Sequence, residues 1–410
     1  MPTRARPTRQ FRMHSEGPSG VHTAVAAAAT RRGATTAAAL AGLLLAALLL
    51  ATQLLAGAAL ARSVTVLTHD SFAISREVIE TFTAETGIEV RFVAGGDAGT
   101  TLNRAILTRE RPIADVLFGV DEGLLPRALA VDLFEPYLSP QLDAVDPAYR
   151  LEAFGDMVTP IDAGFVTFNL DRAWFEADGR DLPASLEDLA DPAYAGLTVV
   201  MDPATSSPGL AFVLGTIGVY GEEGWLEYWA RLRDNGVAVR SGWTDAYYTA
   251  FSRYGGDRPI VLSYASSPAA EVLFSDDPDA EVAPTANLRC EGCSVRQIET
   301  AGVLAGAANP DEARAFIDFM LSPTFQADVP LQMFVYPVRA DTPLPPTFEA
   351  FAEVPAAFEL APLPEDVSAE RVERWLDQWT EVVLRGGDPA ATRERTAVAK
   401  CRATARGPSS

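Results

Sequence analysis

The sequence predicts an α/β clamp: two lobes, each a mostly parallel sheet flanked by helices, joined by two hinge crossings. Short apolar strands alternate with amphipathic helices in two separate sets, which begin near Val64 and Thr198. The segments 159–169 and 296–303 read as strands, and they fall where the chain would pass from one lobe to the other and return. The length of about 349 residues after Ala61 also suits two domains.

The first set reads as strand and helix repeated three times. Its strands are predicted at 64–67, 90–93 and 115–119, and its helices at 74–86, about 101–107 and 122–130. In the first helix Val78, Ile79 and Phe82 share an apolar face, and Gly87 provides its end. The turn 95–100 precedes the second helix and places Asp97 and Ala98 after a strand.

The second set contains strands at 198–201 and 259–263 and a helix at 210–220. Helices are also predicted at 313–321 and 368–384, and the i, i+4 pair Trp375 and Trp379 in the latter is expected in the core. We therefore expect lobe 1 at 62–160 plus about 299–340, lobe 2 at 161–298, a C-terminal helical segment packing on the lobes at 341–385, and a disordered basic tail at 386–410.

Residues 1–61 have the pattern of a signal peptide. Six arginines and one acidic residue precede an uncharged stretch rich in Ala and Leu, which ends in a small-x-small cleavage pattern at 57–61. A retained membrane anchor is the alternative, because the stretch is long enough to span a bilayer. Arg31-Arg32 leaves twin-arginine export open beside the general route. We expect cleavage and a periplasmic location.

The charge of the remaining chain restricts its partners. Residues 62–410 hold 54 of the 55 acidic residues and 27 of the 33 basic ones. Such a surface repels nucleic acid and favours small cations. We expect a monomer with no resident cofactor and no metal.

Cys290 and Cys293 form a single CxxC, which is half of the usual set of zinc ligands. In an oxidising compartment this spacing predicts a local disulfide between them, with free thiols or a metal role as alternatives.

Three motifs stand where strands meet helices: DPATSSPG at 202–209, SGWTDAYY at 241–248 and LSYASSP at 262–268. Ligands in α/β proteins are held at such strand ends. Ser206 or Ser207 caps the helix that follows, and its first amides can hold an anion or a polar ring, although capping alone would also explain the serines. Trp243 and Tyr264 emerge at two strand ends, where they can stack on a flat ring or pack into the core.

The three motifs, in this order and spacing, resemble those of the periplasmic thiamine-binding proteins of ABC importers. The resemblance extends from about Ser63 to Arg385 and includes the segments 68–72 (THDSF), 114–121 (ADVLFGVD) and 336–338 (YPV). It implies the type II periplasmic binding protein fold, thiamine or thiamine phosphates as the ligand, and an ABC transporter permease in the inner membrane as the partner.

The resemblance also implies roles for individual residues. Trp243 and Tyr264 would contact the thiamine rings, while Ser206 and the Asp97-Ala98 turn would face the hydroxyethyl or phosphate end. The remaining ligand-binding candidates are Ser207, His69, Asp121 and Tyr336. Three positions depart from the family pattern, with His69 and Ala270 in place of tyrosines and Phe334 in place of a tryptophan.

Three other functions remain open. A ferric-ion binding protein would use a histidine and two adjacent tyrosines, but Tyr247 and Tyr248 are predicted within a helix, where neighbours point about 100° apart. Polyamine or phosphonate binding would suit the same clamp. A thiamine-degrading enzyme would need a cysteine nucleophile in the cleft, and the sequence has none between Arg62 and Asp162. We expect a binding protein and not an enzyme.

Overall fold

The computed structural model describes residues 62–396 except 276, 278 and 279. The predicted signal peptide, the export alternatives, Cys401 and the last part of the predicted tail lie outside the described residues. Within the described part of the chain, no helix is both long and apolar enough to cross a membrane.

The protein is built on one mixed sheet with the main strand order β2-β1-β3-β10-β5-β8-β6-β7. The strands are β1 (Arg62–Thr68), β2 (Ile88–Ala94), β3 (Val116–Val120), β4 (Phe134–Glu135), β5 (Thr159–Asp171), β6 (Thr198–Met201), β7 (Ala238–Arg240), β8 (Ile260–Tyr264), β9 (Thr285–Asn287), β10 (Val295–Leu304) and β11 (Tyr336–Pro337).

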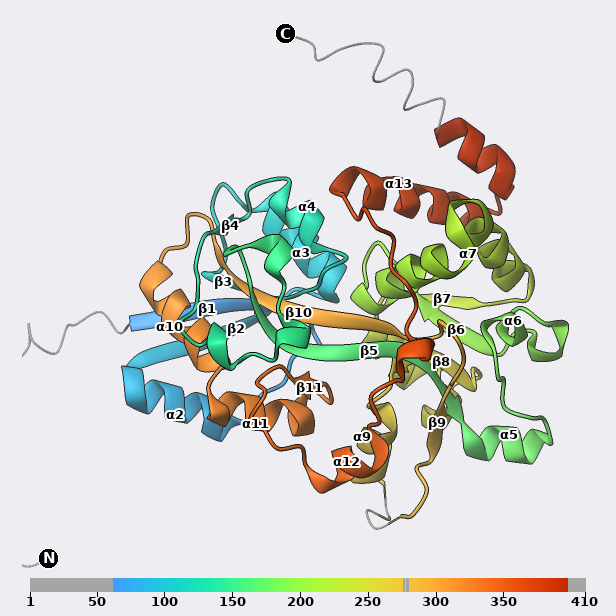
Figure 1. The fold of residues 1–410 in the computed structure, drawn as a ribbon, viewed down its shortest axis with the longest axis horizontal. Helices are drawn as coiled ribbons and strands as arrows, with labels where there is room; N and C mark the ends of the chain where they lie inside the picture. Colours follow the sequence, from blue (N-terminus) through green and yellow to red (C-terminus); the bar gives the residue numbers. More distant parts are fainter. Residues whose placement is uncertain (1–61, 276, 278–279, 397–410) are drawn as a thin grey trace, which may run out of the picture. The chain divides into compact units, whose positions relative to one another are not determined.

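The sheet divides at β5 and β10, the two long strands that run across the molecule in Figure 1. On one side β1 pairs in parallel with β2 and β3, and on the other β6 pairs in parallel with β7 and β8. The two long strands are antiparallel to each other and to β3 and β8. The predicted two-lobe clamp is therefore confirmed, and the structure adds that the hinge strands unite both lobes in one sheet.

Helices cover both faces of the sheet (Figure 1). They are α2 (Arg76–Thr86), α3 (Ala98–Leu107), α4 (Leu125–Leu129), α5 (Arg172–Asp178), α6 (Leu186–Leu189), α7 (Ser207–Asp234), α8 (Trp243–Asp245), α9 (Ser267–Leu273), α10 (Pro310–Met320), α11 (Pro323–Gln332), α12 (Pro346–Phe351) and α13 (Ala369–Trp379). Single π-helical turns, η5 (Ala246–Ala250) and η8 (Thr380–Leu384), follow α8 and α13.

The local signals read from the sequence account for several helix ends. Helix α2 ends at Gly87, which adopts the left-handed conformation with φ 69°. Helix α7 begins with Pro208 in its first turn and is interrupted at Gly221, close to its predicted end at Tyr220. It then continues to Asp234, which the sequence analysis did not predict.

The C-terminal segment packs on lobe 2. Trp375 and Trp379 are fully buried, as predicted, and the Trp379 ring meets Trp229 of α7 edge-on at 5.5 Å between centroids. This contact fixes α7 from behind, while the first turn of α7 faces the cleft.

The predicted disordered tail at 386–410 is wrong for its first part. Residues 389–396 are helical. Arg393 pairs with Glu227 at 2.8 Å, Thr392 is buried, and Gln378 donates to Thr396 at 2.7 Å. The segment is held by polar and ionic contacts, so an analysis of apolar periodicity did not detect it.

The predicted disulfide is absent from the structure. Cys290 and Cys293 are free thiols on lobe 2, and neither lines the cleft cavity described below. The Cys293 sulfur instead accepts the backbone N–H of Cys290 at 2.8 Å. The short CxxC turn thus also places this sulfur against the backbone.

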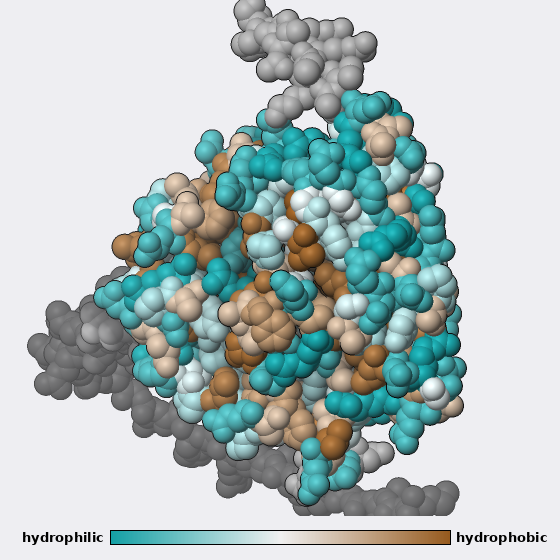
Figure 2. Space-filling view, turned by 45° about the vertical axis from the view of Figure 1, so that its right-hand side comes forward, coloured by the Kyte–Doolittle hydropathy of each residue, from teal (hydrophilic) through white to brown (hydrophobic). Residues whose placement is uncertain are grey.

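Figure 2 shows a mostly hydrophilic surface with apolar side chains gathered near the centre of the face. That surface agrees with the excess of acidic residues in the sequence.

Candidate functional site

A cavity of about 330 Å³ lies between the two lobes, within the size range of small-molecule sites. It is lined by His69, Asp70, Ser71, Asp97, Ser207, Pro208, Trp243, Thr244, Tyr247, Tyr248, Tyr254, Tyr264, Ser267, Ala270, Glu271, Phe274, Glu299, Gln332, Met333, Phe334 and Val335. The parallel strands explain its position: the chain leaves β1, β2, β6, β7 and β8 at their carboxyl ends, and the residues just beyond these ends meet in the cleft.

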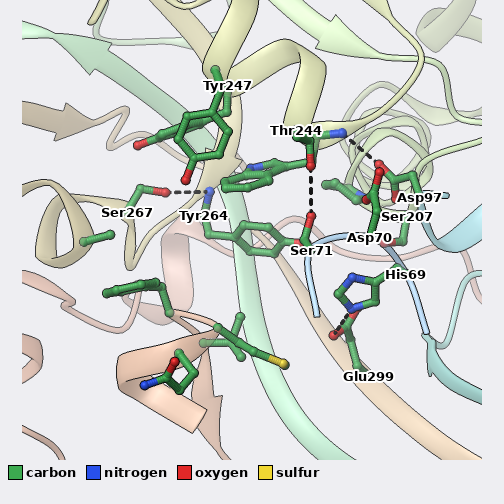
Figure 3. A pocket seen from close by; sticks show the side chains of 18 of the residues that line it. His69, Asp70, Ser71, Asp97, Ser207, Thr244, Tyr247, Tyr264, Ser267 and Glu299 are labelled. Carbon is green, nitrogen blue, oxygen red and sulfur yellow. Dashed lines mark hydrogen bonds and ion pairs between the residues drawn. The ribbon is translucent and has the colours of Figure 1, made fainter. Parts of the chain in front are cut away.

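Five predicted ligand-binding residues line this cavity. They are His69, Asp97, Ser207, Trp243 and Tyr264, which come from both lobes. Figure 3 shows most of them around the cavity, with His69 beside Glu299.

Tyr336, in contrast, is not a ligand-binding residue in this structure. It is buried, its hydroxyl donates to the Ala352 carbonyl at 2.7 Å, and its ring packs against Phe165 and Phe348. The YPV motif marks β11, which pairs with the hinge strand β5, so its tyrosine is part of the core.

Asp121, Ala98 and Ser206 are also buried and do not line the cavity. Asp121 accepts the Leu124 N–H at 2.9 Å and thereby fixes the turn before α4, and burial raises its pKa well above the usual range. Ala98 and Ser206 stand at the starts of α3 and α7, one layer behind the lining.

The aromatic wall of the cavity, formed by Trp243 and Tyr264, is held in place by residues on its far side from the cavity. The Trp243 indole N–H donates to Ser263 at 2.8 Å, and the ring stacks on Tyr247 with centroids 4.8 Å apart and planes 21° apart. The Tyr264 hydroxyl donates to Gln297 at 3.2 Å. Its ring lies so close to Gly164 that a Cβ there would be 2.8 Å from Cε1, so only glycine gives the ring this position.

The sequence analysis missed three tyrosines and a carboxylate. Tyr247, Tyr248 and Tyr254 all line the cavity. The first two lie in the π-helical turn after α8, where a regular helix was expected, and Tyr254 lies in the 3-10 turn that follows. Glu271 accepts the hydroxyls of Tyr247 at 2.7 Å and Tyr254 at 2.9 Å, and Arg253 pairs with it at 3.0 Å. The detectable signal was one acidic residue in an otherwise uncharged helix, directly after the LSYASSP motif.

Glu299, also missed, faces the cavity from the hinge strand β10. Its carboxylate lies 3.3 Å from Nε2 of His69. Burial alone would lower the pKa of His69, but Glu299, with smaller effects from Asp97 and Asp70, raises it above the ordinary value. An acidic residue within a predicted crossing strand was the sequence signal.

The opposite hinge strand adds a second buried carboxyl, because Asp162 of β5 lies in register with Glu299. Burial, reinforced by the charge of Glu299, raises the pKa of Asp162 well above its usual range. The hinge therefore favours the protonated form of Asp162 next to a carboxylate that reaches the cavity.

The two lobes are in contact at one side of the cavity. Asp97 of lobe 1 accepts the backbone N–H of Trp243 of lobe 2 at 2.8 Å. Thr100 donates its N–H to the Thr205 carbonyl at 3.1 Å, and the hydroxyls of Ser71 and Thr244 are 3.3 Å apart (Figure 3). The structure thus shows the clamp closed.

No group of three or more His, Cys, Asp or Glu side chains in the described part of the chain is arranged to hold a metal ion. The cavity instead combines flat aromatic rings with carboxylates. This combination suits a small aromatic ligand that carries positive charge.

The fold and this interlobe cavity define a type II periplasmic binding protein. Residues 111–357 match the family of bacterial extracellular solute-binding proteins. A solved structure named periplasmic thiamin binding protein superimposes with a TM-score of 0.69 at 30% identity and covers 78% of this chain and 96% of that one.

A curated thiamine-binding periplasmic protein from Salmonella typhimurium is 32% identical over 333 residues, which are 80% of this chain and 95% of that protein. The iron uptake protein A1 of Synechocystis is 27% identical over 71% of this chain and 80% of its own length. The chain therefore belongs to the family of bacterial extracellular solute-binding proteins, in the group of the thiamine-binding periplasmic proteins.

Proposed function

We propose that this protein captures thiamine, or a thiamine phosphate, outside the cytoplasm and delivers it to an ABC importer. The observation that carries the proposal is the pairing of Trp243 and Tyr264 with the carboxylate of Glu299 in a closed interlobe cavity. Thiamine has two flat rings, one of which is a cation, and this cavity offers aromatic faces and negative charge.

The energies are consistent with useful affinity. A cation against a desolvated aromatic face gains about 2 kcal/mol, whereas micromolar binding needs about 8 kcal/mol. The rings of Trp243 and Tyr264 therefore supply about half of this binding free energy. The carboxylates and hydrogen bonds of the cavity supply the remainder.

The clamp gives the delivery step a physical basis. A ligand that contacts both lobes stabilises the closed form seen here. The closed form then docks on the permease in the inner membrane. The family relationship and the excess of negative charge support a periplasmic location for the mature chain, action as a monomer, and release of the ligand chemically unchanged.

Titration calorimetry on the mature chain tests the proposal. We expect saturable heat with thiamine or its phosphates at one site per chain, and recovery of intact ligand by mass spectrometry. Ferric ion, a polyamine and a phosphonate serve as comparison ligands. Binding of ferric ion with no response to the thiamine series would contradict the proposal, and recovery of cleaved ligand would indicate an enzyme.

His69 provides a prediction about pH. Because its pKa is raised, His69 becomes positively charged as the pH falls through a value above about 6.5. An imidazolium about 8 Å from a cationic ring costs about 2 kcal/mol at an effective dielectric constant of about 20. Thiamine affinity should therefore decrease by roughly 30-fold between about pH 8 and pH 5.

The measurement is thiamine affinity against pH for the wild type and for His69→Gln, which cannot titrate. Protonation of the ligand's own aminopyrimidine affects both proteins equally, so only the difference between the curves reports on His69. Superimposable pH profiles would show that His69 does not act on the ligand.

A further inference from the structure

The carboxyl group of Asp162 is buried in the hinge without a hydrogen-bond donor from another residue. Asp162 is 0% exposed, and within the described part of the chain neither of its oxygens accepts an N–H or O–H. Its paired neighbours are Glu299 on β10 and Pro337 on β11. Directly paired residues point to the same face of a sheet, so Asp162 has a second carboxyl group on one side and a proline, which lacks an N–H, on the other.

A second buried aspartate shows what this environment lacks. Asp115 accepts the backbone N–H groups of Thr65 at 2.9 Å and of Asn309 at 2.8 Å, and the Asn309 side-chain amide at 3.2 Å. Donors of this kind stabilise a buried carboxylate, and a buried carboxyl group without them tends to keep its proton. The protonated carboxylic acid is therefore the form of Asp162 that fits this position.

The charges around the pair lead to the same conclusion. The titratable and charged groups packed around Asp162 and Glu299 come from the neighbouring strands and from the turns after β1 and β3; they are His69, Asp121, Glu122, Tyr264 and Arg296. Arg296 pairs with Glu122 at 3.8 Å, and Nε2 of His69 lies 3.3 Å from a Glu299 oxygen. Among these groups one imidazole thus serves the pair. Two buried carboxyl groups side by side cannot both ionise without a large cost, and a hydrogen bond with Glu299 adds to burial in raising the pKa of Asp162.

We propose that Asp162 is a positioning residue whose carboxylic acid O–H donates to the Glu299 carboxylate and holds it toward the cavity as a single negative charge. Asp162 itself does not line the cavity. The strand register shifts directly after this pair, between Glu299 and Thr300, and such bulges redirect side chains next to functional sites. The inference rests on the proposed function, because thiamine is the cation that Glu299 would attract.

Thiamine titrations with Asp162→Asn and Asp162→Leu test this role at about pH 8, where an ordinary aspartate is fully ionised. Asparagine carries no charge and can still donate an N–H to Glu299, so its affinity should stay within about threefold of the wild type. Leucine has a similar size and no donor. Because hydrogen bonds to an ionised group are among the stronger ones, Asp162→Leu should weaken binding by about tenfold.

Two measurements on the ligand-free protein test the proton itself. Infrared spectra at about pH 8 should contain the carbonyl band of a protonated carboxyl group, and Asp162→Asn should lack it. In denaturation experiments an aspartate of the unfolded chain loses its proton near pH ~3.9 while folded Asp162 keeps it, so the wild type should lose stability relative to Asp162→Asn as the pH rises above about 4. Asp162→Asn should then be the more stable protein at about pH 8.

Asp115→Asn is the matched control for these measurements, because Asp115 is buried, has its own donors and does not line the cavity. It should be less stable than the wild type and bind thiamine as the wild type does.

Three results would overturn the inference. Equal losses of affinity in Asp162→Asn and Asp162→Leu would show that the ligand needs a charged Asp162, and wild-type affinity in Asp162→Leu would show that Glu299 needs no positioning. An unchanged infrared spectrum in a less stable Asp162→Asn would show that Asp162 holds no proton. Failure of the wild type to bind thiamine would overturn the proposed function and the role toward this ligand, and the ligand-free measurements separate that failure from a wrong assignment of the proton.

Discussion

Thiamine binding should weaken by about 10- to 150-fold when Trp243 is replaced by alanine, because about 1.5–3 kcal/mol of stacking on the cationic ligand is lost. The structure supports this size of effect. Ser263 and Tyr247 hold the indole at the cavity wall, so its orientation is set before the ligand arrives. Titration calorimetry of wild type and Trp243→Ala at the same pH and salt concentration measures the change directly.

Trp174→Ala is a suitable control, since Trp174 is another partly buried tryptophan of lobe 2 that does not line the cavity. It should bind thiamine as the wild type does. Tyr264→Ala should weaken thiamine binding about as much as Trp243→Ala does. Tyr264→Phe should weaken it less, because only the hydrogen bond to Gln297 is lost. Wild-type affinity in a folded Trp243→Ala protein would mean that the ligand lies elsewhere.

The largest effect on stability is expected from Trp379→Ala. Truncation of a fully buried tryptophan costs about 3–5 kcal/mol, because apolar contact is lost and a cavity remains. Trp379 packs on Trp229 of α7, so the change should loosen the C-terminal segment from lobe 2. Chemical denaturation without ligand measures the free energy of unfolding, since a bound ligand would add stability of its own.

Trp174→Ala serves again for comparison. Removing its partly buried ring should lower the free energy of unfolding far less than removing the Trp379 ring. A loss below about 1 kcal/mol in Trp379→Ala would show that the C-terminal segment contributes little to the stability of lobe 2.

The sequence alone determined the order of the elements and the chemistry at the strand ends. Apolar strands followed by capped helices predicted both lobes, because these signals depend on residues a few positions apart. The same logic placed Ser207, Trp243 and Tyr264 in one cleft, because carboxyl ends of parallel strands meet at one edge of a sheet, and the family resemblance added His69 and Asp97.

Only the tertiary structure decided which of these side chains face the ligand. Tyr336 belongs to a motif of the family resemblance but is core, because β11 pairs with the hinge strand. Tyr247 and Tyr248 were predicted within a regular helix, and in the structure both lie in a π-helical turn and line the cavity. Small changes in local helix geometry reorient side chains, and composition does not reveal them.

The tertiary structure also decided the contacts between residues distant in the chain. Glu299 reaches His69 across 230 positions, and Asp97 reaches Trp243 across 146. The first pair depends on the place of hinge strand β10 beside β3 and β1 in the sheet, and the second depends on the closure of the two lobes. Those are properties of the whole packed molecule, so the sequence provided the participants, and their pairing was set by the strand order and by the closure of the two lobes.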